Sequence, residues 1–282
     1  MRTLIALWMA FAALSWTPPQ QDSQWPVDPG SLKFAVIGDN GTGDRPEYEV
    51  GQQLAAARNT FPFELVIMLG DNMYGRQQPQ DFVDKFERPY RPLLQAGVPF
   101  YATLGNHDNP ANRFYEGFNM GGERYYSFER KNVRFYVFDS NQLDPKQLAW
   151  IEDTLKQPYP GWKIVYFHHP LYSDAGRHGP DVQLRVVLEP LLVRNGVNVV
   201  FSGHEHVYER LVPQKGITYF IDGSSGQLRK GDVLPSPTMA AAFDQDQTFM
   251  LVEVAEAQLS FRTISRTGRV VDSGVIQRRP TT

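Results

Sequence analysis

Six runs of mainly apolar residues recur along the first three quarters of the chain, separated by more polar stretches. Each run has the length of a β-strand and too few polar positions to leave one face in water, which is typical of strands in a sheet covered on both faces. The runs are KFAVIG (33–38), FELVIMLG (63–70), VPFYATLG (98–105), VRFYVFDS (133–140), WKIVYFHH (162–169) and VNVVFSG (197–203).

Two of the intervening segments predict helices. In 143–156, Asp144 is placed to cap the N-terminus, Pro145 suits the first turn, and Leu148, Ile151 and Leu155 form a helical stripe. A second helix is expected from Pro180, with Pro190 expected to kink or split it. Its apolar positions are Leu184, Val187, Leu188, Leu191 and Leu192. Strands alternating with helices indicate the α/β (α+β) class.

The C-terminal part has a different pattern, with closely spaced strands and little helix between them. These segments predict a second, largely antiparallel sheet packed on the first. They are ERLVP (209–213), ITYFID (217–222), FMLVEVA (249–255), QLSFRTI (258–264) and RVVDSG (269–274). Residues 223–247 form a long Gly- and Pro-containing stretch without periodicity, for which we expect a plain surface loop, with a lid over a site as the alternative.

Composition and charge fit one large globular domain, which we place at 33–282. The 282 residues are 41% hydrophobic and 21% charged, enough for a sizeable core. The formal net charge is −3, and no block of Lys and Arg is present. A polymeric nucleic acid or an anionic membrane is therefore not expected as the principal partner.

The N-terminus predicts a processing segment. Arg2 is followed by the apolar run 4–14 and then by a polar, proline-containing stretch, which is typical of a secretory signal peptide. We expect the signal peptide at 1–21, with cleavage between Ala12 and Gln21, and a tether at 22–32. An uncleaved membrane anchor is the alternative. The sequence has no cysteine, so export here predicts a bacterial periplasmic or secreted protein without disulfides.

Five short segments at the ends of apolar runs contain the residues best suited to bind metal ions. They are GDNG (38–41), GDNMY (70–74), GNHD (105–108), FHHP (167–170) and GHEH (203–206). Any one of them alone reads as turn or helix-capping chemistry. All six histidines of the chain nevertheless lie within or beside these segments. The ends of α/β strands are also where ligands bind. Together the segments predict a site for two metal ions.

The order and content of these segments resemble the calcineurin-like metallophosphoesterases, and within them the purple acid phosphatases, over about residues 33–265. Most of that superfamily has a metal-binding histidine two residues after the first aspartate, where this chain has Gly41. Tyr74 stands three residues after Asp71, at the place of the tyrosinate that binds ferric iron in purple acid phosphatases. The resemblance implies a four-layer αββα sandwich of two mixed β-sheets flanked by helices.

The donor types suggest which ions the two sites would hold. Carboxylates and a phenolate with one imidazole suit Fe(III), whereas imidazoles with a neutral amide oxygen suit Zn, Mn or Fe(II). The resemblance implies Asp39, Tyr74 and His206 at the first site and Asn106, His168 and His204 at the second, with Asp71 bridging both. His168 is chosen because the family pattern is H-x-P, and His169 is the alternative.

The resemblance implies an acid phosphatase that hydrolyses small phosphomonoesters by in-line attack of a metal-bound hydroxide. His107 is the first choice as general acid or phosphate donor, and His178 is the second. Asp108 is expected to orient His107, and Arg177 is a further candidate for phosphate contact. A phosphodiesterase or nucleotide hydrolase on the same metals is the alternative activity, and a non-catalytic metal-binding protein is the alternative class.

Overall fold

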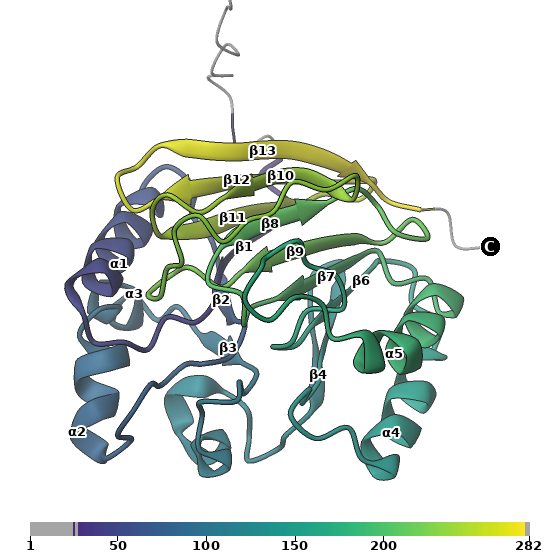
Figure 1. The fold of residues 1–282 in the computed structure, drawn as a ribbon, viewed down its shortest axis with the longest axis horizontal. Helices are drawn as coiled ribbons and strands as arrows, with labels where there is room; N and C mark the ends of the chain where they lie inside the picture. The colour runs from purple at the N-terminus through teal and green to yellow at the C-terminus, as the bar shows by residue number, and fades with distance from the viewer. Residues whose placement is uncertain (1–24, 26–27, 280–282) are drawn as a thin grey trace, which may run out of the picture.

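The computed structural model describes residue 25 and residues 28–279, which include two facing β-sheets with helices on their outer sides (Figure 1). The predicted signal peptide at 1–21 lies outside the described residues. Within the predicted tether, Trp25 stacks on Phe61 with ring centroids 4.1 Å apart, and the hydroxyl of Ser31 donates to Glu253. The described part of that segment therefore packs on the body of the protein.

The first sheet has six strands in the order β13-β12-β11-β1-β2-β3. Their bounds are Leu32–Ile37 (β1), Leu65–Met68 (β2), Phe100–Ala102 (β3), Thr248–Val254 (β11), Gln258–Ser265 (β12) and Val270–Gln277 (β13). Strands β1, β2 and β3 run parallel to one another, while β11 pairs with β1 antiparallel. This sheet is therefore mixed.

The second sheet has seven strands in the order β10-β8-β9-β7-β6-β5-β4. Their bounds are Tyr126–Arg130 (β4), Val133–Val137 (β5), Trp162–Tyr166 (β6), Val199–Ser202 (β7), Tyr208–Leu211 (β8), Thr218–Asp222 (β9) and Met239–Phe243 (β10). Strands β5, β6, β7 and β9 are parallel, and β4, β8 and β10 add antiparallel pairs. This sheet is mixed as well.

Alternation along each strand divides the core into three layers. On β1, Phe34 and Val36 face the other sheet, whereas Ala35 and Ile37 face the helices, because successive side chains of a strand point to opposite sides. Both sets are fully buried, which explains why the strands appear as continuous apolar runs in the sequence. The four-layer αββα sandwich is confirmed.

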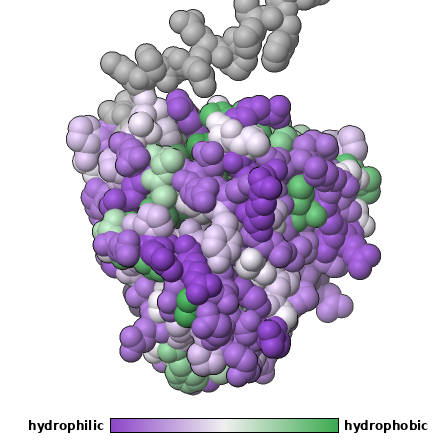
Figure 2. All heavy atoms as spheres, turned by 90° about the vertical axis from the view of Figure 1, so that its left-hand side faces the viewer, coloured by the Kyte–Doolittle hydropathy of each residue, from purple (hydrophilic) through white to green (hydrophobic). Residues whose placement is uncertain are grey.

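The helices cover the outer faces of the sheets. The first sheet carries α1 (Arg45–Ala57), α2 (Pro79–Phe82), a π-helical turn (Val83–Glu87) and α3 (Arg91–Gln95), and the second carries α4 (Pro145–Leu155) and α5 (Val182–Arg194). Two 3₁₀ turns, Pro110–Phe114 and Glu116–Phe118, follow β3. The face seen in Figure 2 is mainly hydrophilic with small, separate hydrophobic patches. Among the described residues, no helix has both the length and the apolar character needed to cross a membrane.

Both predicted helices are confirmed, with one difference at Pro190. The Asp144 side chain accepts from the backbone N–H of Gln147 and caps α4. Asp181 caps α5 in the same way. Helix α5 continues through Pro190 to Arg194, so the proline does not split it.

The predicted grouping of the C-terminal strands is wrong. They do not form a separate sheet, because β8 and β9 join β7 in the second sheet, whereas β11, β12 and β13 extend the first sheet from β1. The register pairs Leu32 with Val254 and Val199 with Thr218. A periodic pattern shows that a segment is a strand, but the choice of partner depends on contacts between residues far apart in the chain.

The segment 223–247 is more ordered than its composition indicates. It contains strand β10, which pairs with β8. Ahead of that strand, the backbone N–H of Gly176 donates to Asp232, and that of Leu234 donates to Asp174. These contacts join 223–238 to the loop 170–181. The segment is therefore an ordered part of the fold and not the plain surface loop that was expected.

Candidate metal centre

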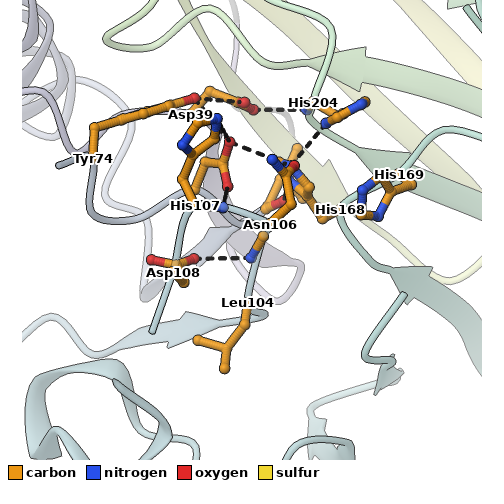
Figure 3. Close-up of polar contacts among 12 residues, drawn as sticks. Asp39, Tyr74, Leu104, Asn106, His107, Asp108, His168, His169 and His204 are labelled. Atoms are coloured by element: carbon orange, nitrogen blue, oxygen red, sulfur yellow. Dashed lines mark hydrogen bonds and ion pairs between the residues drawn. The ribbon is translucent and has the colours of Figure 1, made fainter. Parts of the chain in front are cut away.

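The predicted ligands lie where parallel strands of the two sheets end. Asp39 follows β1, Asp71 follows β2, Asn106 follows β3, and His168 and His204 follow β6 and β7. Because the carboxyl ends of parallel strands share one edge, side chains from both sheets meet there. Figure 3 shows Asp39, Asn106, His168 and His204 converging on one volume.

The four residues predicted for the first metal come together around the phenol of Tyr74. Its hydroxyl lies 3.0 Å from Asp39 Oδ1, 3.0 Å from Asp71 Oδ2 and 3.1 Å from His206 Nε2. Both carboxylates are buried, with Asp39 at 0% and Asp71 at 1% exposure. The donor set is oxygen-rich, buried and negatively charged, which fits a hard trivalent ion.

The second cluster is built from nitrogen and amide donors. His168 Nε2 lies 3.0 Å from Asn106 Oδ1, 3.2 Å from His204 Nδ1 and 3.5 Å from Asp71 Oδ2. The other ring nitrogen of His168 lies 3.0 Å from the carbonyl of Leu69, a contact that directs Nε2 toward the cluster. Asp71 contacts both clusters, as a bridging carboxylate would.

His169 lies beside the second cluster. Its Nδ1 is 2.9 Å from Ser140 Oγ, and its ring centroid is 4.5 Å from that of His204. His168, His169 and His204 are close enough together to hold a metal ion, and so are Asp39, Asp71 and His168. The contacts with Asn106 and Asp71 belong to His168.

Close approach of backbone segments explains the glycine in the first motif. A Cβ atom on Gly41 would lie 1.8 Å from the carbonyl oxygen of Asn72, so no larger residue fits there without separating the two motifs. The backbone N–H of Tyr74 donates to the Gly41 carbonyl at 2.9 Å. Gly41 thus leaves space for the tyrosine segment in place of a histidine ligand.

Three of the site residues adopt the left-handed conformation that non-glycine residues rarely take. The φ angles are 51° for Asp39, 51° for Asp71 and 71° for His204. Such backbone strain concentrates at functional sites, where the surrounding structure enforces it. The backbone N–H of His204 donates to Asp39 Oδ2 at 2.8 Å, which links motifs from the two sheets.

The electrostatics of the protein groups favour cations in this volume. Burial raises the pKa of Tyr74, and the neighbouring carboxylates of Asp39 and Asp71 raise it further. Burial opposes ionisation of Asp71 as well, but the charge and hydrogen bond of His168 and the contacts with His107 together outweigh it and lower the pKa of Asp71. The same carboxylates overcome burial at His168 and raise its pKa to about 9. A bound cation would reverse the expectation for the phenol.

His107 and His178 flank the two clusters. The His107 backbone N–H donates to Asp71 Oδ1 at 2.8 Å, its ring centroid is 4.7 Å from that of Tyr74, and its side chain is 51% exposed. The His178 ring stacks on His204 with centroids 4.4 Å apart. Arg177, next to His178, is exposed.

Asp108 has a different role from the one expected. Its Oδ2 accepts from the backbone N–H groups of Asn72 and Gly105 and from the Asn72 side chain. The carboxylate therefore joins the GDNMY and GNHD segments instead of orienting the His107 ring. Burial raises the pKa of Asp108 to about 7.

Sequence reasoning missed two polar residues that support the site. Gln77 donates to the carbonyl of His107 and accepts from the backbone N–H of Asn109. Glu205 stands between two predicted ligands and is fully buried. Its place inside GHEH, between two predicted ligands, was the signal that could have found it.

Comparison with known proteins identifies the family. A sequence profile described as calcineurin-like phosphoesterase matches residues 32–208. Purple acid phosphatase 3 of Arabidopsis thaliana is 30% identical over 271 residues, covering 82% of this chain and 73% of the plant protein. The chain therefore belongs to the calcineurin-like phosphoesterase family, as a purple acid phosphatase-like member.

Two solved structures share the fold. A purple acid phosphatase from yellow lupin (Lupinus luteus) seeds superposes with a TM-score of 0.74 at 21% identity, covering 90% of this chain and 58% of the lupin chain. An anchor protein of the inner membrane complex of Plasmodium superposes with a TM-score of 0.75 at 17% identity, covering 89% and 90%. Because a shared fold does not define an activity, the function has to be argued from the site.

Proposed function

We propose that this protein is a binuclear-metal acid phosphatase that hydrolyses phosphate monoesters. The observation that carries the proposal is the convergence of the Tyr74 hydroxyl with Asp39, Asp71 and His206 within 3.1 Å. We assign Fe(III) to this set, and Zn, Mn or Fe(II) to Asn106, His168 and His204, with Asp71 shared. When bound, the two ions would supply the charge that activates water and neutralises the phosphoryl oxygens.

The two flanking histidines supply the proton chemistry. The ester alkoxide must take a proton as its bond to phosphorus breaks, and a positioned imidazole is the usual donor. His107 lies on the Tyr74 side and His178 on the His204 side of the centre. We assign His107 as general acid or phosphate donor and His178 as a second hydrogen-bond donor to the phosphoryl oxygens.

Monoester selectivity is supported by the number of donors around the site. A terminal phosphate has three non-bridging oxygens, and two ions with two imidazoles offer partners for all of them. A diester has only two such oxygens, so it would leave one of these partners without a phosphoryl oxygen. A phosphodiesterase or nucleotide hydrolase remains the alternative activity, and it is separated by comparing turnover of p-nitrophenyl phosphate with that of bis(p-nitrophenyl) phosphate.

We further propose that the substrate is a small phosphomonoester met outside the cytoplasm, as the signal-like 1–21 indicates. The intact mass of the protein recovered from the periplasm or medium of a bacterial host tests this. A chain shortened between Ala12 and Gln21 supports export with cleavage. A full-length, membrane-bound chain contradicts cleavage and supports the uncleaved membrane anchor.

The decisive experiment is the visible absorption spectrum of the iron-loaded protein beside Tyr74→Phe, together with phosphomonoester turnover. We expect a tyrosinate-to-Fe(III) charge-transfer band that disappears in Tyr74→Phe. Tyr115→Phe is the matched control, because that phenol donates to Glu87 away from the centre, and its band should be unchanged. A band that persists in Tyr74→Phe contradicts the first-site assignment. A colourless but active protein would mean that the centre holds Mn or Zn instead of iron. That outcome would strengthen the phosphodiesterase alternative.

A further inference from the structure

Glu205 lies between the predicted ligands His204 and His206, yet its carboxylate serves other parts of the chain. Oε1 accepts from the backbone N–H of His178 at 3.1 Å and from that of Gly179 at 2.6 Å. Oε2 lies 3.6 Å from Arg229 Nη1. The residue is fully buried, so these contacts are shielded from water.

Three segments distant in sequence meet at this one carboxylate. They are the GHEH turn itself, the loop containing His178, and the segment containing Arg229, whose backbone N–H donates to the carbonyl of His206 at 2.9 Å. Where the carboxylate is ionised, hydrogen bonds to it from successive N–H groups are charge-assisted and stronger than bonds between neutral groups. The backbone at 178–179 is therefore held in place beside His204 of the second cluster.

The position of the backbone at 178–179 determines where the His178 ring lies. The ring stacks on His204 at 4.4 Å and 29°, and its Nδ1 is 3.6 Å from Glu205 Oε1. Elsewhere the loop is held by Gly176, whose backbone N–H donates to the Asp232 carbonyl, and by Asp181, whose backbone N–H donates to the Pro170 carbonyl. The two bonds to Glu205 hold the stretch between these points, where Arg177 and His178 are exposed. Without the carboxylate, the loop would lose the two bonds that hold it at this point.

We propose that Glu205 is a positioning residue that holds His178 against the second metal cluster, in the place where it can donate to a bound phosphate. This inference rests on the proposed phosphatase function for its catalytic consequence, but the positioning itself can be measured without turnover. A metal-binding role is not assigned to Glu205.

The first test is hydrogen exchange of the full, metal-free chain, read at the amides of His178 and Gly179. In Glu205→Ala we expect these amides to exchange at least about tenfold faster than in the wild type. In Glu205→Gln, which retains a carbonyl oxygen as acceptor, we expect most of the protection to return. Unchanged protection in Glu205→Ala would overturn the proposal.

The second test is a double-mutant cycle on the metal-loaded enzyme with p-nitrophenyl phosphate. His178→Ala should lower kcat/KM by roughly 100-fold in the wild-type background, the scale of one proton or hydrogen-bond donor. In the Glu205→Ala background the same substitution should cost less than about threefold, because the ring has already lost its place. Metal content should stay unchanged in Glu205→Ala. If the two substitutions lowered kcat/KM by independent factors that multiply, or if Glu205→Ala lost metal, the positioning role would be overturned.

Glu209 provides a matched control from the same part of the fold. Its carboxylate accepts from Ser173 Oγ at 3.2 Å and from the backbone N–H of Asp174 at 3.0 Å, so it anchors the start of the same loop. Glu209→Ala should show little coupling to His178→Ala, and equal coupling would overturn the specific assignment to Glu205. An inactive, metal-loaded wild type would instead contradict the proposed function, while the exchange measurement would still test Glu205.

Discussion

At the scale of single residues, the site contains buried carboxylates, whose ionised forms are unfavourable without a nearby positive charge. Asp39 and Asp71 are both buried, and the Tyr74 hydroxyl contacts one oxygen of each carboxylate. Both residues have a left-handed backbone conformation. Gly41 is equally specific, since it permits the contact between the first and second motifs. Small changes here should alter metal binding more than global stability.

Gly41→Ala tests that contact. The added Cβ would lie 1.8 Å from the Asn72 carbonyl oxygen, so the 38–41 and 71–74 segments must separate. We expect metal affinity to fall by roughly tenfold or more, as for other changes that displace ligands indirectly. Metal titration followed by elemental analysis measures this. Gly30→Ala is the control, because its Cβ would meet Asp28 at an ordinary 3.4 Å. Wild-type affinity in Gly41→Ala would show that the contact is not required.

Glu209 predicts a pH dependence of stability. Burial raises its folded-state pKa to about 7, above the ordinary value of 4.5. A carboxyl group with a raised folded pKa contributes stability below pH 4.5, and that contribution is lost as the pH rises through 7. Between pH 5 and 8, the wild type should lose up to about 3 kcal/mol more unfolding free energy than Glu209→Gln. Urea unfolding at both pH values measures the difference, and parallel pH profiles would refute it.

At the scale of elements, local sequence signals account for the helices and loops that frame the site. Helix α4 begins at Pro145 because the Asp144 carboxylate accepts from the backbone N–H of Gln147 at 2.8 Å. The other carboxylate oxygen accepts from Arg124 at 2.8 Å. The apolar side of α4 then packs Ile151 and Leu155 against the second sheet. Capping and burial thus act together in this element.

Asp144→Ala should reduce the unfolding free energy by about 1 kcal/mol, the usual cost of losing a side-chain N-cap. Urea unfolding followed by circular dichroism measures it. Asp153→Ala is the control on the same helix, because Asp153 is 80% exposed and pairs with Lys156 only at the surface. We expect the control to change stability by less than about 0.5 kcal/mol. Equal effects of the two substitutions would exclude the capping explanation.

At the scale of the whole molecule, packing between the sheets brings the two halves of the candidate metal centre together. Asp39, Asp71 and Asn106 follow strands of the first sheet, whereas His168 and His204 follow strands of the second. Between the sheets, the Phe34 ring meets Phe135 edge-on at 5.3 Å and Phe201 at 6.2 Å. The distances across the site therefore depend on this inner core.

Phe34→Ala should cost about 3 to 5 kcal/mol of unfolding free energy, because it removes a fully buried aromatic ring and leaves a cavity between the sheets. Denaturant unfolding of the metal-loaded protein measures the loss. Val275→Ala on the outer strand β13 is the control, since Val275 is 56% exposed. A cost below about 1 kcal/mol for Phe34→Ala would mean that the inner core can close around the cavity.

The amino-acid sequence by itself determined the parts of this protein that depend on local properties. Continuous apolar runs predicted β1, β2, β3, β5, β6 and β7, since burial on both faces removes polar positions along the strand. Asp144 and Pro145 predicted the start of α4. The five polar segments identified the candidate ligands, because metal ions require particular donor types and these segments together supply them at strand ends.

Only the tertiary structure decided how distant segments meet. It divided the C-terminal strands between two sheets, placed the Gly41 backbone against Asn72, turned Asp108 toward backbone donors, and set Glu205 behind His178. None of these contacts produces a periodic pattern in the sequence, because each joins residues that are far apart in the chain. Their energies arise from packing and hydrogen bonds that exist only once both sheets have assembled.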